Sequence, residues 1–420
     1  MPAPGPPGGE VEVGPHHACS ADHPIDVRRK FLLELGSDLL SGGLCVHDVE
    51  GMLRAVGGAL GSHHVVVAAA PTGLFVAMSS DESTGFHPVA AGLRFEQTAD
   101  VLEVMHAVRH RSLDCTAAVA RLDLIRNRPA PWPAWISDLG ALPICAGLCL
   151  FLQPAVANVL VAAVASLLIA GATAASRRWQ SVRPLVPVAA AFSVSVLVLL
   201  ATEAGWMQGP LRTIVAVLAV LLPGTLLVTG LSEIAAGALQ AGTARLIAGA
   251  AQLVLFLTGV LAAVAVTRAP STVLANTSVD HQGAWAIVVG LAIAVAGIVV
   301  NFYLPLQAIV SITAVVTVTA ATQLGVQHFY GPGFGGLAGA VTAAAAAAVA
   351  HKLPDGPSWQ VAYLPAFWVL VPGGFGLLNT AGIGSGSGTP ALLTAVFAVV
   401  GVSVGTLIGA PFSRLGLRDD

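Results

Sequence analysis

Few ionisable side chains lie in the apolar part of this 420-residue chain, and these are the first candidates for chemistry. Glu233 is the one charged residue in the run 224–242, whereas Asp138, Glu203 and Arg245 lie near the ends of apolar stretches. An ionisable group at the centre of a bilayer costs about 2.5–3.5 kcal/mol on insertion scales, so such a group usually has a function. Glu233 could carry a proton or bind an ammonium group. The alternative is a loop carboxylate near Arg245.

Two Pro-Gly pairs interrupt apolar stretches of the sequence. Pro223-Gly224 lies in the stretch 212–231, and Pro372-Gly373 lies in the stretch 361–379. Proline removes a backbone donor and glycine relaxes the turn, so nearby carbonyls and amides become available to a solute. A single pair would be explained by the ordinary abundance of proline and glycine in membrane helices. Two pairs at matching places instead predict functional breaks.

Polar residues near these breaks complete the candidate site. We expect substrate or ion binding by Glu233, Pro223, Gly224, Thr225, Thr229, Pro372, Gly373, Asn379 and Thr380. Asn158, Asn301 and Gln307 are further polar candidates. The N-terminus of a half-helix can bind a carboxylate, and free carbonyls or a carboxylate can bind an ammonium. For each polar side chain, the alternative role is an interhelical hydrogen bond that stabilises packing in lipid.

The composition predicts a membrane protein. Hydrophobic residues make up 55% of the chain, charged residues make up 10%, and the mean hydropathy is +0.81. Because soluble domains carry about 25% charged residues, the composition argues against a soluble enzyme, a disordered chain and a nucleic-acid binder. The net charge of −3 indicates no polyanionic partner. Five cysteines without a CxxC pair indicate neither a disulfide framework nor a zinc site.

Charges are concentrated at the start of the chain, which predicts a water-exposed domain fused to a lipid-exposed one. Residues 1–130 hold ten Lys/Arg and fifteen Asp/Glu, whereas residues 131–420 hold nine and seven. The run 126–133 marks the boundary, because its prolines stop a helix and its tryptophan suits a membrane interface. The expected domains are a disordered tail (1–25), a cytosolic α+β domain (26–130), two membrane repeats (131–270 and 281–412) and a cytosolic tail (413–420).

The expected cytosolic domain contains helices and a strand pair. Apolar residues recur at helical spacing over 27–41, 45–60, 97–110 and 113–126, and short strands flank a turn at 71–73. Cys45, His47 and Asp48 lie together at a helix start, where a Cys/His nucleophile or a metal site is conceivable. Their spacing matches no known ligand frame. We therefore expect His47 and Asp48 to cap and decorate the helix, and we expect no metal or cofactor.

Ten apolar stretches after residue 133 are long enough to cross a bilayer as helices, which takes roughly 20 residues each. They are 134–153, 155–175, 184–203, 212–231, 246–267, 283–300, 304–324, 333–351, 361–379 and 390–410. Basic residues predict their orientation, because cytosolic loops are enriched in Lys and Arg. One side holds Arg177, Arg178, Arg183, Arg245, Lys352, Arg414 and Arg418, and the other holds Arg212 and Arg268. This asymmetry predicts that both termini are cytosolic.

The ten stretches fall into two sets of five that repeat after 149 residues, since adding 149 to Pro223 gives Pro372. An odd number of spans inverts the second set. The basic pair Arg177-Arg178 accordingly corresponds to the uncharged stretch 326–327. Inverted repeats with matching breaks are typical of secondary transporters. The expected fold is an α-helical polytopic membrane protein with ten transmembrane helices in two inverted five-helix repeats and a small α+β N-terminal cytosolic domain.

Several segments resemble the threonine/serine exporter family. They are the helix-turn-helix stretch 31–50, the turn Pro71-Thr72 and the blocks 221–224, 230–234 and 242–246. The second half is similar to the small partner that some members carry as a separate protein. The resemblance implies a cytosolic N-terminal domain, ten spans and export of threonine and serine driven by the proton motive force. Split relatives are associated with dicarboxylate export.

We therefore expect a secondary active transporter that exports threonine/serine-type small amino acids in exchange for protons. The alternatives are a dicarboxylate (succinate-like) exporter of the same fold, a membrane-anchored enzyme that uses the N-terminal domain, and a passive pore. The expected partners are an amino acid, protons, the lipid bilayer and a second copy of the chain, with no nucleic acid. We expect no catalytic residues, and we expect a multi-pass protein of the inner or plasma membrane.

Overall fold

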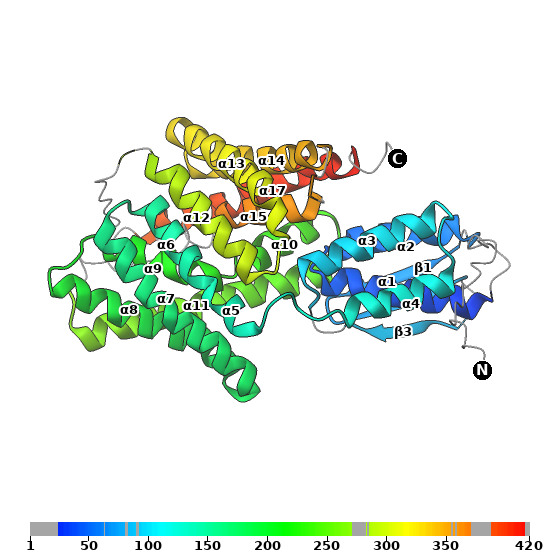
Figure 1. The fold of residues 1–420 in the computed structure, drawn as a ribbon, viewed down its shortest axis with the longest axis horizontal. Helices are drawn as coiled ribbons and strands as arrows, with labels where there is room; N and C mark the ends of the chain where they lie inside the picture. Colours follow the sequence, from blue (N-terminus) through cyan, green and yellow to red (C-terminus); the bar gives the residue numbers. More distant parts are fainter. Residues whose placement is uncertain are drawn as a thin grey trace, which may run out of the picture. The chain divides into compact units, whose positions relative to one another are not determined.

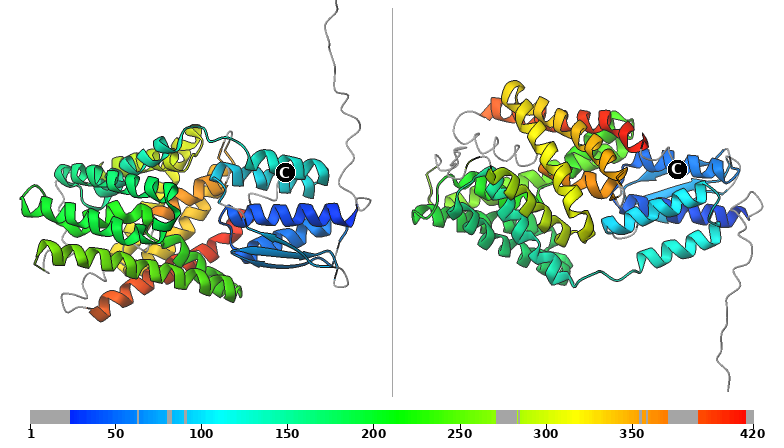
Figure 2. Two further views of the ribbon diagram at one scale, coloured as in Figure 1. Left: turned by 90° about the horizontal axis from the view of Figure 1, so that it is seen from below. Right: turned by 45° about the horizontal axis from the view of Figure 1, so that its top comes forward.

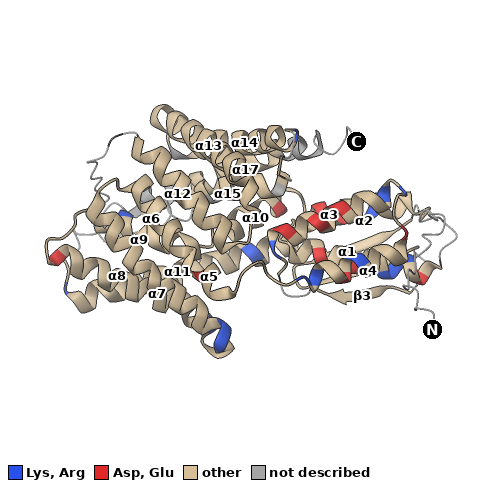
Figure 3. Ribbon diagram, viewed as in Figure 1, with Lys and Arg blue, Asp and Glu red and all other residues tan. Residues whose placement is uncertain are grey.

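A computed structural model describes residues 24–62, 64–79, 83–89, 92–270, 283, 285–353, 356–357, 359–370 and 388–415. The chain divides into two compact units. The first unit consists of Met1–Leu93 and Asp100–Arg128, and the second consists of Arg94–Ala99 and Pro129–Asp420. Figure 3 shows charged residues along α1 to α4 and few along the later helices, apart from a basic end of α7.

The first elements of the chain are helices around a small sheet (Figure 1). They are α1 (Ile25–Ser41), α2 (Val46–Ala59), β1 (Val66–Ala70), β2 (Gly73–Ala77), β3 (Gly85–Pro88), α3 (Phe95–Arg109) and α4 (Cys115–Arg126). The four predicted helices and the predicted strand pair are present. The third strand, β3, was not predicted, because its four residues Gly-Phe-His-Pro are too few to show an alternating pattern.

The sheet is antiparallel in the order β1-β2-β3, and its two faces differ. Leu74 and Val76 of β2 are fully buried on the face that α1 and α2 cover. Phe75 pairs with Phe86 on the other face, where the rings lie 4.9 Å apart and both side chains are exposed. The period-2 alternation of a strand therefore gives this sheet one buried and one open apolar face.

An ion cluster joins α1 to α4 inside the first unit. Arg126 donates from Nε to Asp38 Oδ1 at 2.7 Å and from Nη1 to Glu34 Oε2 at 3.1 Å. Asp38 is 1% exposed, and burial raises the pKa of its carboxyl above the ordinary value, although the Arg126 guanidinium opposes that shift. The ionised form of Asp38 therefore depends on Arg126 for its stability.

Cys115, at the start of α4, is disulfide-bonded, whereas Cys45, Cys145 and Cys149 form no disulfide within the described part of the chain. The sequence did not indicate a disulfide, because an odd cysteine count with irregular spacing gives no pairing pattern.

The second unit is built from apolar helices (Figure 1). Its elements are α5 (Ala134–Leu139), α6 (Ala141–Leu152), α7 (Val156–Arg178), η1 (Gln180–Leu185), α8 (Val186–Glu203), α9 (Pro210–Leu218), η2 (Ala219–Leu221), α10 (Gly224–Ala235), α11 (Leu239–Thr267), α12 (Trp285–Asn301), η4 (Leu306–Ala308), α13 (Ile309–Tyr330), α14 (Pro332–His351), α15 (Trp359–Val369) and α17 (Gly388–Leu415).

Six of these helical segments are long and apolar enough to cross a membrane. They are Ala134–Leu152, Val156–Arg178, Gln180–Glu203, Leu239–Thr267, Leu306–Tyr330 and Gly333–His351. A bent pair, Pro210–Leu221 with Gly224–Ala235, could form a seventh span, and Trp285–Asn301 and Val396–Gly409 are shorter apolar helices. Exposed apolar side chains such as Leu160 and Ile247 suit contact with lipid. The predicted second break at Pro372-Gly373 lies outside the described residues.

The second unit has two hydrophobic cores. One core is formed by α6, α7, α8, α9 and α11. The other core is formed by α12, α13, α14, α15 and α17, together with Ile144 and Val228. The two cores show the same pattern of helix pairing. α8 packs on α11 and on α9, while α14 packs on α17 and on α15 (Figure 2).

The helix pair α6 and α12 joins the two cores through glycines. A Cβ on Gly297 would lie 2.8 Å from Gly140 O, and a Cβ on Gly290 would lie 2.7 Å from Gly147 O. The two helices are antiparallel, because Gly140 lies near the end of α12 and Gly147 lies near its middle. Side chains larger than hydrogen at these positions would force the backbones apart, so glycine is required for this close crossing.

We predict that the Arg126→Met substitution destabilises the first unit by about 3 kcal/mol at neutral pH, because it leaves the Asp38 carboxylate buried without its cation. The loss should shrink as the pH falls towards about 4, since a neutral carboxyl does not need that partner. Hydrogen exchange of α1 and α4 in the full-length chain measures both effects. The double variant Asp38→Asn/Arg126→Met should regain part of the stability. A loss that is equal at every pH would contradict this account.

Candidate functional site

The predicted break at Pro223-Gly224 is confirmed. The helices on its two sides, Pro210–Leu221 and Gly224–Ala235, differ in direction by 64°. Leu222 adopts an extended conformation with φ −66° and ψ 139°, and Pro223 has no N–H to donate. The α-helical ladder therefore stops at this point, and backbone groups need partners elsewhere.

Side chains from neighbouring helices supply some of those partners. Gln252 on α11 donates from Nε2 to Leu221 O at 2.9 Å, and the Cys145 thiol on α6 lies 3.4 Å from Val217 O. Sequence reasoning missed Gln252, although it is the one amide side chain in the apolar run of α11 between Leu246 and Thr267. A polar residue alone in such a run was the signal that could have found it.

Two glycines bring α10 and α11 into backbone contact. A Cβ on Gly242 would lie 2.6 Å from Gly230 O and 2.7 Å from Ile234 N. A Cβ on Gly230 would lie 2.8 Å from Leu246 N. The chain reverses between the helices at Gly237, whose φ of +91° favours glycine. This close crossing fixes which residues of the two helices face each other.

Glu233 follows Gly230 by three residues, and Arg245 follows Gly242 by three residues, so the crossing brings the two side chains together as a buried ion pair. Arg245 Nη1 lies 3.0 Å from Glu233 Oε1. The Glu233 side chain is fully buried, and the Arg245 side chain is 14% exposed. The alternative that Glu233 is a loop carboxylate was wrong, because Glu233 belongs to α10; its predicted proximity to Arg245 is confirmed. A buried pair offers a negative and a positive charge in a medium that screens them poorly.

The other polar residues of α10 differ in their burial. Ser232 is 3% exposed, and its hydroxyl has no hydrogen-bond partner among the described residues. Thr229 is half-buried, whereas Thr225 is exposed. Pro223 and Gly224 are buried. Ser232 and Thr229 are thus the hydroxyl groups of α10 with restricted access to solvent.

The remaining polar candidates do not join this site. Asn158 is buried and donates to Gln208 O at 2.7 Å and to Thr213 Oγ1 at 2.9 Å, so it performs the interhelical packing role. Asn301 exchanges hydrogen bonds with Ser137 in the same role. Gln307 is exposed.

Two other carboxylates also lie apart from the pair. Asp138 pairs with Arg177, and Glu203 is exposed. Asn379 and Thr380, like Pro372 and Gly373, lie outside the described residues.

Within the described part of the chain, one group of side chains has the geometry of metal ligands. It consists of Cys45, His47 and Asp48 in the first unit. No such group is found among the described residues of the second unit.

The apolar helices, the helix break and the buried ion pair define a multi-pass helical membrane protein. Residues 30–267 match the ThrE family model, which is described as "Putative threonine/serine exporter". The match covers more than half of the chain and ends at the last residue of α11, so the chain belongs to the threonine/serine exporter family, a family of transporters. No curated protein and no solved structure gives a significant match.

We predict that Gly242→Ala destabilises the second unit by about 1–3 kcal/mol, because the new methyl group would meet the backbone of α10. The matched control is Gly171→Ala in α7, where a Cβ has nothing within 4 Å. Thermal unfolding in detergent compares the two variants with the unsubstituted chain. A Gly242→Ala variant as stable as Gly171→Ala would show that the close crossing is not required.

Proposed function

We propose that this protein exports threonine- and serine-type amino acids in exchange for protons. The observation that carries the proposal is the buried Glu233–Arg245 pair, whose carboxylate lies on the helix that follows the break, in a member of an exporter family. An amino acid at neutral pH carries one ammonium and one carboxylate. Glu233 can bind the ammonium and Arg245 can bind the carboxylate, so the pair matches both charges of such a substrate.

The proton has a plausible acceptor in the same pair. A proton that enters from outside would neutralise Glu233 and break its attraction to Arg245. Proton and ammonium then compete for one carboxylate, which is the requirement for exchange. One charge crossing about 150 mV releases about 3.5 kcal/mol, enough for a gradient of a few hundredfold.

We further propose that the second unit spans the membrane ten times as two inverted repeats. Adding 149 to Pro210, the start of α9, gives Trp359, the start of α15; adding 149 to Leu239 gives Gly388, the start of α17. The glycine contacts of α6 and α12 support a two-fold relation as well. Gly140 corresponds to Gly290, and Gly147 corresponds to Gly297, each 150 residues later. Across the helix contact, Gly140 lies against Gly297 and Gly147 lies against Gly290.

We propose that the protein lies in the inner or plasma membrane of the cell. We also propose that both termini face the cytosol. Arg177, Arg178 and Arg183 at the end of α7 and in η1 support this orientation, because basic residues are retained on the cytosolic side. The first unit, with its charged surface, would then lie in the cytosol, and its role there is proposed to be regulatory.

A dicarboxylate exporter is the second candidate function, and Arg245 is the observation that favours it. A buried guanidinium could bind one carboxylate of a dianion. Glu233, 3.0 Å away, would repel that dianion, which favours a zwitterion instead.

Counterflow in proteoliposomes tests the function. Labelled threonine or serine should exchange against the same unlabelled amino acid, whereas succinate should not. We predict that Glu233→Gln lowers export driven by a proton gradient at least about tenfold, a difference of about 1.4 kcal/mol or more, and that it also weakens counterflow, because the substrate ammonium loses its carboxylate. The control Glu203→Gln, at an exposed carboxylate, should leave both activities unchanged. Unaltered proton-driven export in Glu233→Gln would refute the proton assignment, and succinate counterflow alone would favour the second function.

Cysteine labelling in intact cells tests the inversion. Arg178→Cys lies at the end of α7, and His328→Cys lies near the matching end of α13; both positions are exposed. A membrane-impermeant maleimide should label His328→Cys from outside and Arg178→Cys only after the cells are permeabilised. Labelling of both from the same side would exclude inverted halves. The unsubstituted chain reports the background from its own cysteines.

A further inference from the structure

The start of α2 contains a cluster that the transport proposal does not use. The residue at the N-cap is Cys45, with φ −67° and ψ 141°, and its own side chain makes no capping hydrogen bond. His47 and Asp48, which we expect to cap and decorate the helix, lie in its first turn. Ser, Thr, Asp and Asn are the usual N-cap residues, so cysteine here gives the helix little stability.

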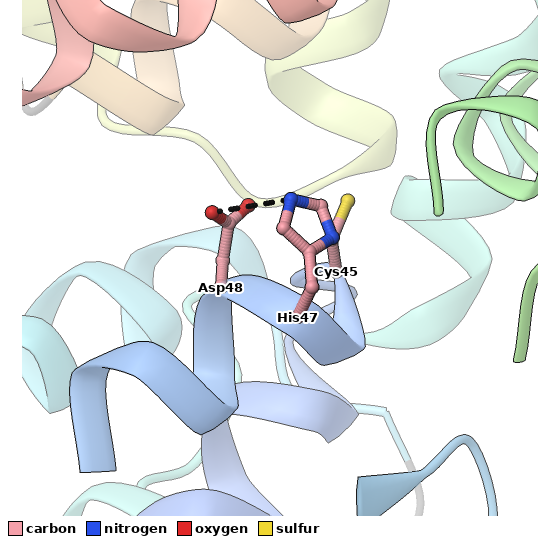
Figure 4. A group of neighbouring side chains, drawn as sticks. All are labelled: Cys45, His47 and Asp48. Atoms are coloured by element: carbon pink, nitrogen blue, oxygen red, sulfur yellow. Dashed lines mark ion pairs between the residues drawn. The ribbon is translucent and has the colours of Figure 1, made fainter. Parts of the chain in front are cut away.

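The three side chains converge in space. One ligand atom from each of Cys45, His47 and Asp48 lies within 4.8 Å of the other two (Figure 4). His47 Nε2 lies 3.5 Å from Asp48 Oδ1. This distance is long for a hydrogen bond, but it is close to the separation of about 3.3 Å between two light ligand atoms on a tetrahedral zinc ion. The second ring nitrogen, His47 Nδ1, is buried without a hydrogen-bond partner among the described residues.

The chemistry of the three groups favours a borderline or soft divalent metal. Thiolate, imidazole and carboxylate are the ligands that Zn²⁺ uses, whereas Ca²⁺ and Mg²⁺ prefer oxygen alone. The N-terminus of a helix stabilises negative charge, which favours the thiolate of Cys45 and the carboxylate of Asp48. An ion could reach them, because the side chains of His47 and Asp48 are 28% and 35% exposed.

We propose that Cys45, His47 and Asp48 bind one Zn²⁺ ion, with a fourth position left for water. This site is independent of the transport proposal, because it lies in the first unit and shares no residue with the Glu233–Arg245 pair. The usual alternative is a solvated His–Asp ion pair, which contributes little at this exposure. That alternative does not account for the position of the Cys45 thiol beside the same imidazole.

Metal titration of the full-length protein tests the site. The chain is purified in detergent with a histidine-free tag, treated with a chelator, and titrated with Co²⁺ and then with Zn²⁺. We predict one ion per chain and a thiolate-to-Co²⁺ charge-transfer band that Zn²⁺ removes. His47→Gln and Asp48→Asn should each weaken binding at least about tenfold, since each removes one ligand. Zn²⁺ should also protect Cys45 from alkylation by a maleimide.

The controls separate metal binding from folding. Cys45→Ser should abolish the charge-transfer band while α2 stays folded, because serine is a good N-cap residue. His64→Gln removes an exposed histidine of the same unit and should bind Co²⁺ normally. Binding that persists in Cys45→Ser/His47→Gln, or that is lost equally in His64→Gln, would show adventitious binding and overturn the proposal. Absence of a stoichiometric ion would do the same.

Discussion

The structure of the second unit depends on one constraint: lipid offers no hydrogen bonds to a peptide group. A helix can stop inside such a medium only where neighbouring residues replace the lost backbone bonds. At Pro223-Gly224 they do, because Gln252 binds Leu221 O and Cys145 approaches Val217 O. The break is therefore a property of the surrounding helices as much as of the proline. Its backbone polar groups become accessible to side chains of neighbouring helices, and that accessibility makes it a candidate site.

The same constraint explains why the two charges on α10 and α11 are paired. Glu233 and Arg245 compensate each other at 3.0 Å, and neither could be buried as cheaply alone. Gly230 and Gly242 allow their helices to approach until the two side chains meet. Backbone contact and charge pairing thus hold α10 against α11, so that movement of α10 alters the environment of Glu233.

Several of these features could be predicted from the sequence, and others could not. The apolar periodicity gave the helix ranges, and the Pro-Gly pair gave the bend, because both effects are local to a few residues. The partner of Glu233 could be suspected from proximity alone, but its burial depends on a helix crossing that tertiary packing decides. Gln252 was missed for the same reason. The short strand β3 and the N-cap at Cys45 were missed because four residues and one residue, respectively, carry too little pattern.

The glycine contacts between α6 and α12 have a mechanical consequence. Where side chains interdigitate, a helix can rotate against its neighbour only if its ridge of side chains moves from one groove of that neighbour to the next. At Gly140, Gly147, Gly290 and Gly297 the contact is mainly between backbone atoms, so the two helices can roll by small angles with few such steps. This contact would let the two cores rotate slightly against each other, and a single added methyl group would be enough to block that rotation.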